Sequence, residues 1–434
     1  MKIALVGYDT EGKASYEYFQ SQGQDITIHD QSTEIVVPPG VKSVLGKNYL
    51  NNLDQYDLIV RTAGLSPKKL EATNPGILSK TTTLINEFIK ASPTKHIIGI
   101  TGTKGKGTTS TLTAKMLQAV GKDVHLGGNI GVPPLTFLNK LTPKSWVVLE
   151  LSSFQLIDLS ASPSIAVCLM VTPEHLDWHL DLDEYLQSKS QLFRHQSPED
   201  IAIYFANSNL SQQIASSSPG QKIPYFIPPG AYINQGTIMI DDQVICRTSD
   251  LKLLGKHNWQ NVCAAVTAAW QVAQDVTAYH SVLTSFRGLE HRLEFVREVN
   301  HIRFYNDTYA TGLQATIAAI EAIDGKKVMI LGGYDRMSDL SNFASYASEH
   351  QEKFRTLLLI GASSKRLAAA LQAVGFTNYV LKPELPNIGA IVHEAYGLAQ
   401  SGDAVVLSPG FASFDMFKNF TERGNQFKAT VNNL

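Results

Sequence analysis

The chain has 434 residues, with 37 Lys and Arg against 39 Asp and Glu, and a formal net charge of −2. Because these charges are spread along the chain, no basic face or arm favours binding to nucleic acid or to an anionic membrane. The length predicts two to four domains. Cys168, Cys246 and Cys263 lie far apart without a C-x-x-C pair, which indicates a reduced, cytoplasmic protein.

The N-terminal stretch "MKIALVGYDTEG" has no long apolar region and no cleavage-like site, so we interpret it as part of the fold and not as a signal peptide. No apolar run approaches the roughly 20 residues that cross a bilayer. We therefore expect a soluble protein.

Residues 1–93 alternate short apolar runs with turns and polar stretches. The runs are "KIALVG", "DITIHD", "VKSVLG" and "YDLIVRTAG". Such alternation is typical of an α/β domain. The segment "ASPTK" at 91–95 is the expected linker to the next domain.

Residues 94–288 begin with an apolar run, a glycine-rich turn and a helix. They continue with the runs "SWVVLELSS" and "SIAVCLMVT" and the polar helix "LDEYLQSKSQLFRH". Continuous apolar runs predict a buried parallel sheet. Residues 205–250 are rich in Ser, Pro, Gly and Asn around "YFI", "TIMI" and "QVICR", so we expect a β-rich excursion there, before a helix that starts at "GKHNWQN".

Residues 289–434 add the runs "IRFYND", "KKVMILGG", "TLLLIG" and "DAVVLSPG", separated by helices. The predicted fold class is therefore α/β, with three consecutive α/β domains at 1–93, 94–288 and 289–434.

The turn "TGTKGKGTT" at 101–109 resembles a phosphate-binding loop, because a glycine turn between strand and helix points backbone N–H groups at phosphate oxygens. A tight turn without a ligand is the alternative. The usual loop has Ser or Thr directly after its lysine, whereas Gly107 follows Lys106 here, so Thr108 or Thr109 would supply the hydroxyl. We expect Gly107 to be constrained by backbone shape instead.

Glu150 ends the run "WVVLE", and ligand sites of parallel sheets collect at the carboxyl ends of strands. Its carboxylate is a candidate Mg²⁺ ligand. A solvated acid at a strand end is the alternative.

Eight motifs occur in the order seen in the Mur ligase family, and the sequence resembles this family over all three domains. They are "TGTKGKGT", "LELSSFQL", "VTPEHLDWH", "YLQSK", "GKHNWQN", "GLEHRLEF", "YNDTYAT" and "LSPGFASFDMFKNFTERGNQF". The similarity is closest to the branch that adds glutamate, expected as D-glutamate, to UDP-N-acetylmuramoyl-L-alanine.

The resemblance implies a Rossmann-like N-terminal domain for the UDP-substrate, a central P-loop ATPase domain and a Rossmann-like C-terminal domain for the amino acid. The implied enzyme is a cytoplasmic, monomeric, ATP-dependent carboxylate–amine ligase of peptidoglycan precursor synthesis. It would form an acyl phosphate with ATP and two Mg²⁺ ions.

The resemblance also implies roles for single residues. The catalytic residues would be Lys106, Glu150, His175 and Lys189. The metal ligands would be Thr108, Glu150, His175 and Lys189, the last as a carbamate. ATP would contact Gly102, Thr103, Lys104, Gly105, Lys106, Gly107, Thr108, Thr109, Asn258, Arg292 and Asp307. His257 and Asn261 accompany Asn258 at the helix start, where an amide can read adenine.

The UDP-substrate would contact Tyr8, Asp9, Thr10, Gly12, Asp30, Thr62, Gly64 and Asn129. The amino acid would contact Thr311, Arg336, Ser413 and Phe420. Two positions depart from the family pattern, because Tyr309 and Arg336 stand where lysines are common. They leave the stereochemistry of the amino acid open.

Three alternatives remain at this point. The loop "GTKGKGT" is similar to that of folylpolyglutamate synthase, a ligase with the same ATP-dependent chemistry. A variant Mur ligase could add another amino acid. A non-catalytic nucleotide-sugar sensor could have lost the chemistry through Gly107 and Tyr309, although Lys106, Glu150, His175 and Lys189 together argue against it.

Overall fold

The computed structural model describes residues 1–253, 255–256 and 258–434, so the prediction for His257 lies outside the described residues. The chain forms two compact units. Unit 1 comprises Met1–Leu251 and Trp259–Ser285, and unit 2 comprises Lys252–Asn258 and Phe286–Leu434.

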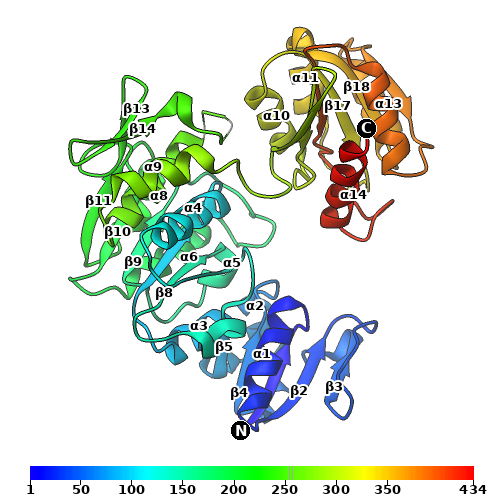
Figure 1. Cartoon of the computed structure of the whole chain (residues 1–434). Coiled ribbons are helices and arrows are strands. Elements are labelled where there is room, and N and C mark those ends of the chain that lie inside the picture. Colours follow the sequence, from blue (N-terminus) through cyan, green and yellow to red (C-terminus); the bar gives the residue numbers. More distant parts are fainter. Residues whose placement is uncertain (254, 257) are drawn as a thin grey trace. The chain divides into compact units, whose positions relative to one another are not determined.

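Unit 1 begins with a five-stranded parallel sheet in the order β3-β2-β1-β4-β5. Its strands are β1 (Lys2–Val6), β2 (Asp25–Asp30), β3 (Lys42–Leu45), β4 (Leu58–Arg61) and β5 (Thr81–Thr83). Three α-helices accompany them, α1 (Thr10–Ser21), α2 (Pro67–Thr73) and α3 (Leu84–Ala91) (Figure 1). Four of the five β1 residues are buried, as expected for a parallel sheet covered on both faces.

The second sheet of unit 1 has six parallel strands in the order β11-β10-β9-β6-β8-β7. They are β6 (Ile97–Thr101), β7 (Val124–Gly128), β8 (Trp146–Glu150), β9 (Ile165–Cys168), β10 (Ile201–Phe205) and β11 (Gln221–Tyr225). The accompanying α-helices are α4 (Lys106–Ala119), α5 (Ser153–Leu156), α6 (Leu182–Arg194) and α7 (Asn209–Ala215).

The expected β-rich excursion is shorter than predicted. β11, which precedes Phe226, pairs with β10 and so extends the parallel sheet. Among the described residues, a separate antiparallel sheet consists of β12 (Tyr232–Asn234), β13 (Thr237–Ile240) and β14 (Gln243–Arg247). Two helices follow, α8 (Asn258–Trp270) and α9 (Val276–Ser285).

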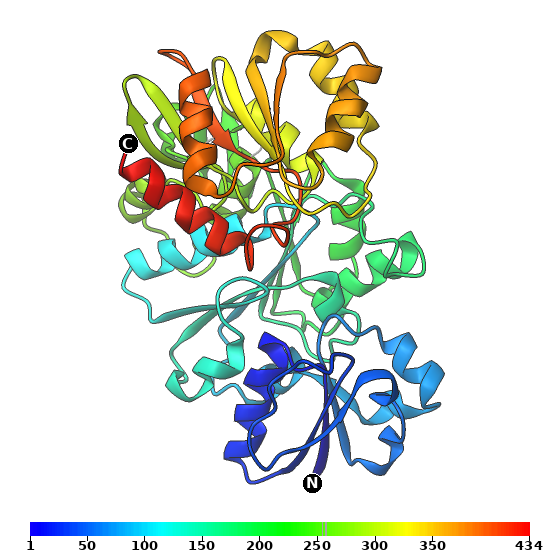
Figure 2. The same ribbon diagram turned by 90° about the vertical axis from the view of Figure 1, so that its right-hand side faces the viewer.

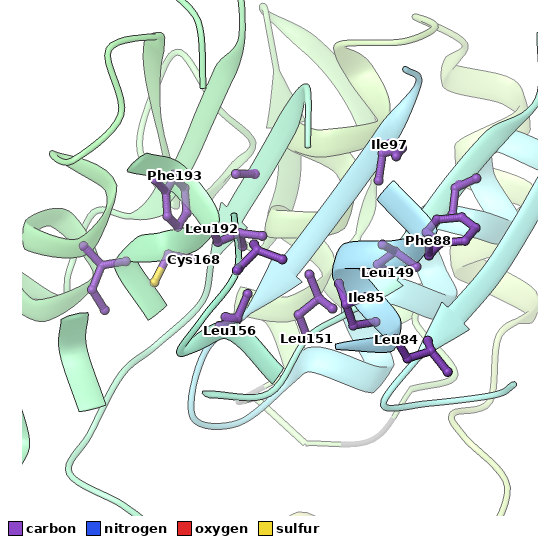
Figure 3. Close-up of a cluster of buried hydrophobic side chains, with 14 of the residues drawn as sticks. Leu84, Ile85, Phe88, Ile97, Leu149, Leu151, Leu156, Cys168, Leu192 and Phe193 are labelled. Carbon is purple, nitrogen blue, oxygen red and sulfur yellow. The ribbon is translucent and has the colours of Figure 1, made fainter. Parts of the chain in front are cut away.

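One hydrophobic cluster in unit 1 contains side chains from both sides of the expected linker at 91–95. Leu84, Ile85 and Phe88 of α3 pack in the same buried cluster as Leu149 and Leu151 (Figure 3). Burial of this shared surface stabilises the pair of sheets as one compact unit. The boundary between residues 93 and 94 therefore stays a prediction.

Unit 2 contains one six-stranded sheet in the order β15-β16-β20-β17-β18-β19, in which only the β15–β16 pair is antiparallel. Its strands are β15 (Glu294–Val299), β16 (Ile302–Asn306), β17 (Lys327–Gly332), β18 (Phe354–Ile360), β19 (Tyr379–Lys382) and β20 (Ala404–Leu407). Its α-helices are α10 (Leu313–Ala322), α11 (Ser341–Glu349), α12 (Ser364–Ala373), α13 (Ile388–Leu398) and α14 (Phe420–Asn432). The C-terminal α14 lies beside α13 (Figures 1 and 2).

All three cysteines are buried and unbridged. Across the described part of the chain, no helix is both long and apolar enough to span a bilayer.

Candidate active site

The glycine-rich loop joins β6 to α4, and β6 lies between β8 and β9 in the sheet. Because these strands are parallel, their carboxyl ends carry the loop, Glu150 and the segment of His175 at one edge. The sheet thus gathers three of the predicted ATP- and metal-binding features at one edge: the glycine-rich loop, Glu150 and the segment of His175.

Backbone geometry explains two glycines of the loop. Gly102 has φ +147° and Gly105 has φ +90°, values that L side chains rarely adopt. A β-carbon at Gly105 would collide with the side chain of Asn261. Gly107 is different, because it lies inside α4 and is not among the glycines with positive φ in the described residues. The expectation that backbone shape constrains Gly107 is therefore wrong.

Two lysines meet at one carbonyl of the loop. Lys106 Nζ donates to Gly102 O at 2.9 Å and to Thr103 O at 2.9 Å. Lys189 Nζ, from α6, donates to the same Gly102 O at 3.1 Å. Two residues predicted from motifs 83 positions apart in the sequence thus share a hydrogen-bond acceptor.

Lys189 is 1% exposed, whereas most lysines on polar helices face solvent. Burial, and then the neighbouring Lys106, lower the pKa of Lys189 to about 7. Its Nζ lies 4.6 Å from the ring centroid of Tyr185, and Tyr185 Oη is 2.8 Å from Thr103 Oγ1. Tyr185 thereby ties α6 to the glycine-rich loop.

Glu150 and Asn129 are brought together by β7 and β8. Asn129 Nδ2 donates to Glu150 Oε1 at 2.8 Å, and Asn129 N donates to Glu150 O at 2.8 Å. Glu150 is buried, so the alternative of a solvated acid is wrong. Asn129, predicted for the UDP-substrate, is in direct contact with the predicted metal ligand.

The remaining central candidates are more dispersed. His175 is half-exposed with φ +58°, and its ring lies 4.8 Å from that of Phe154. Lys104 is exposed, while Thr108 and Thr109 are buried in the first turn of α4. Asn258 is buried and starts α8. Across residues 1–253, 255–256 and 258–434, no three His, Cys, Asp or Glu side chains form a metal-binding group.

The N-terminal candidates surround the turn between β1 and α1. Tyr8 N donates to Asp30 Oδ2 at 2.7 Å, and a β-carbon at Gly12 would collide with Gly7 O. Thr62 is buried after β4, and Thr10 is exposed. Asp9 Oδ1 accepts from Glu11 N and Gly12 N at 3.0 and 3.1 Å, so it caps the N-terminus of α1. The carboxylate of Asp9 thus accepts hydrogen bonds from the backbone N–H groups that could otherwise bind a diphosphate.

Several contacts at this turn were missed by sequence reasoning. Glu11 accepts from Ala63 N and from Gln155 Nε2 at 3.0 and 2.6 Å. Arg61, fully buried, donates twice to Asp158 at 2.7 and 2.6 Å. Trp178 Nε1, from the segment of His175, donates to Gly64 O at 3.2 Å. These bonds join the two sheets of unit 1 beside the predicted UDP-substrate residues.

In unit 2, Asp307 follows β16 and is buried. Its carboxylate accepts from Ser408 Oγ at 2.7 Å and from Leu293 N at 3.0 Å. Burial raises the pKa of Asp307 to about 7. Since β16, β20 and β17 are neighbours, their carboxyl ends bring the segments of Asp307, Ser413 and Arg336 to one edge of the sheet.

The amino-acid candidates at this edge differ in exposure. Ser413 is buried, Phe420 is half-buried, and Thr311 and Arg336 are exposed. Arg423, missed from the sequence, is buried and donates to Thr308 Oγ1 at 2.8 Å, to Thr308 O at 3.1 Å and to Phe411 O at 3.3 Å. Arg423 lies inside the motif "LSPGFASFDMFKNFTERGNQF", which was the available signal, but no role was predicted for it there.

Comparison with known proteins decides the family. Residues 100–269 match the Mur ligase middle domain, and residues 291–411 match the Mur ligase, glutamate ligase domain. The chain belongs to the Mur ligase family. Like other Mur ligases, it is an ATP-dependent ligase of peptidoglycan precursor synthesis.

Two relatives match this Mur ligase over nearly their whole length. Both are UDP-N-acetylmuramoylalanine–D-glutamate ligases, from Clostridium kluyveri and Acetivibrio thermocellus. Each is 34% identical, covering 100% of this chain and 97% and 96% of the relative, respectively. The crystal structure of the MurF ligase of Thermotoga maritima in complex with ADP aligns with a TM-score of 0.60 at 15% identity, over 99% of this chain and 94% of that one. It supports the three-domain α/β Mur ligase fold.

Proposed function

We propose that this Mur ligase joins D-glutamate to UDP-N-acetylmuramoyl-L-alanine with hydrolysis of ATP to ADP and phosphate. The names and the full-length identity of the two relatives support the substrates. The observation that carries the reaction is the meeting of Lys106 and Lys189 at Gly102 O, beside the strand that ends in Glu150. Phosphoryl transfer requires cations beside the phosphates and oxygen ligands for a metal ion; Lys106 would supply the cation, and Glu150 with carbamylated Lys189 would supply the oxygen ligands.

In this reaction an oxygen of the alanine carboxylate attacks the γ-phosphorus and ADP leaves. The amine of glutamate then attacks the carbonyl carbon of the acyl phosphate, loses a proton, and phosphate leaves. Lys106 would exchange its bonds to Gly102 O and Thr103 O for phosphate oxygens, because an ammonium has three donors in total. The loop amides and the N-terminus of α4 would hold the same phosphates.

The residues at the edge of β8 and α4 fit Mg²⁺. Glu150 supplies a buried carboxylate, and Thr109 Oγ1 is buried with no hydrogen-bond partner among the described residues. Thr108 and His175 are the further proposed ligands. A bound Mg²⁺ would neutralise the negative charge of the phosphates.

Lys189 fits the proposed carbamate. Its lowered pKa leaves much of the amine neutral near pH 7, and only the neutral amine forms an N–C bond to CO₂, with release of a proton. The product would be an oxygen ligand in place of a cation.

We assign the UDP-substrate to residues 1–93, ATP to 94–288 and the amino acid to 289–434. Asn258, Arg292 and Asp307 would contact ATP, and Thr311, Arg336, Ser413 and Phe420 would surround glutamate. The enzyme would act as a monomer in the cytoplasm, where ATP is available.

The test is ADP release by the purified protein with ATP, Mg²⁺ and UDP-N-acetylmuramoyl-L-alanine, across a panel of D- and L-amino acids. We expect turnover only when the UDP-substrate and D-glutamate are both present. Turnover with a reduced folate and L-glutamate would support the folylpolyglutamate alternative instead. Turnover with another amino acid would replace D-glutamate as the proposed amino-acid substrate. Absence of turnover with every combination of substrates would refute the proposal.

A further inference from the structure

Tyr309 occupies a defined position in unit 2 although it is 46% exposed. The guanidinium carbon of Arg292 lies 4.7 Å from the centroid of its ring. The ring of Phe420 approaches edge-on, with the centroids 5.2 Å apart and the planes at 83°. The tyrosine thus lies between a residue proposed for ATP and one proposed for the amino acid.

Two hydrogen bonds join the segment of Arg292 to the segment of Tyr309, one between backbone groups and one to the side chain of Asp307. Tyr309 N donates to His291 O at 3.0 Å, and Leu293 N donates to Asp307 Oδ1 at 3.0 Å. His291 and Leu293 both have positive φ, so the segment that carries Arg292 has a special shape. These hydrogen bonds fix the backbone on both sides of Arg292. The contact with the ring of Tyr309 therefore mainly restricts the side-chain conformation of Arg292.

We propose that Tyr309 is a positioning residue that holds the guanidinium of Arg292 over its ring face for ATP. This inference rests on the proposed function. An arginine stacked by its face keeps its N–H donors, which lie in the guanidinium plane, available to phosphate oxygens.

A purely structural role predicts a different pattern. Tyr309 is nearly half-exposed, so its truncation opens no cavity in the core. If Tyr309 positions Arg292, the effect of substituting Tyr309 must disappear when Arg292 is removed.

The test is a double-mutant cycle of Tyr309→Leu and Arg292→Ala, with kcat/KM for ATP and calorimetric affinity for ATP as readouts. We expect Tyr309→Leu to lower both values by roughly two- to fivefold, the range of an exposed cation–π contact. It should have no further effect in the Arg292→Ala background. Tyr309→Phe should have the wild-type kcat/KM and ATP affinity, because it keeps the aromatic ring.

Tyr346→Leu is the matched control, since Lys353 Nζ lies over its ring in the same unit, at 5.8 Å from the centroid. It should leave both readouts unchanged. Additive effects in the cycle, or a Tyr309→Phe variant as impaired as Tyr309→Leu, would overturn the inference. ATP affinity can be measured without a second substrate. If the wild type shows no turnover but the two substitutions still have non-additive effects on ATP affinity, the proposed function is refuted and the positioning role of Tyr309 stands.

Discussion

The burial of Lys189 determines the protonation state, and therefore the reactivity, of its amine. An exposed lysine is fully charged at neutral pH, whereas the shared carbonyl of Gly102 places Lys189 close to a second ammonium in a buried site. Desolvation and that like charge both favour the neutral amine. The residue is therefore suited to react, and poorly suited to serve as a permanent cation.

We expect Lys189→Ala to lose activity by several orders of magnitude and to regain part of it in buffers with acetate or propionate. A small carboxylate can fill the vacated space and supply the oxygen ligand. The rates are measured with and without the added acid. Lys115→Ala, at an exposed position on α4, is the control and should behave as wild type. Normal activity of Lys189→Ala would contradict the assignment.

Asp307 should make the stability of unit 2 depend on pH. Its pKa is about 7 in the folded protein against 3.8 for the ordinary side chain, so the folded state binds its proton more tightly. The contribution to stability is complete below pH 3.8. It is lost as pH rises towards 7, at about 1.4 kcal/mol of unfolding free energy per pH unit.

Asp307→Asn removes this titration, so its stability relative to wild type should rise between pH 4 and pH 7. Hydrogen exchange of β16 and β20 measures the difference. Asp335→Asn is the contrasting control, because the bonds from Arg366 lower the pKa of Asp335 and the sign is reversed. A pH-independent difference for Asp307→Asn would contradict the expectation.

At the scale of elements, local pattern was sufficient for most of the buried parallel strands, but not for the antiparallel β15 or for contacts between distant segments. "DITIHD" coincides with β2, and Glu150 ends β8 as predicted. β15 was missed, because its pairing with β16 is antiparallel and its residues alternate weakly. The bond from Gln155 to Glu11 spans 144 positions, and nothing local at Glu11 indicates its partner.

The capped N-terminus of α1 yields a prediction about the UDP-substrate. Asp9→Ser keeps a capping oxygen but removes the negative charge beside the proposed diphosphate. We expect the affinity for the UDP-substrate to rise by roughly two- to fivefold at low salt, and less at high salt. Calorimetric titration measures it. Asp54→Ser, at an exposed acid in the same part of unit 1, should have no effect. Weaker binding by Asp9→Ser would contradict this expectation and would instead support a direct contact between Asp9 and the UDP-substrate.

At the scale of the whole molecule, the chain forms two compact units, and the three-domain boundaries remain a prediction. The shared cluster around Leu84 and Phe88 and the bonds from Arg61 to Asp158 cross the predicted boundary at residue 93. The sequence predicts a linker at "ASPTK", but it could not indicate that side chains on both sides of this segment pack together.

Limited digestion with trypsin distinguishes the two boundaries. Lys95 and Arg287 are both exposed. However, Lys95 O accepts from Ile97 N and from Ser164 Oγ, whereas Arg287 lies in the irregular segment between α9 and β15. We expect trypsin to cleave after Arg287 first. Mass spectrometry of the fragments at successive times measures the order of cleavage. Earlier cleavage after Lys95 would mean that the two sheets of unit 1 separate readily.

The burial of all three cysteines makes this protein suitable for fluorescent labelling. Burial raises the pKa of Cys168 to about 11 and that of Cys246 to about 12, so few thiolates are available to a maleimide in the folded chain. Val36 is 86% exposed in unit 1, and Val374 follows α12 in unit 2 with 36% of its surface exposed. Cysteines introduced at these two positions would accept a donor and an acceptor dye, and energy transfer between the dyes would follow the distance between the units during turnover without removal of any native thiol.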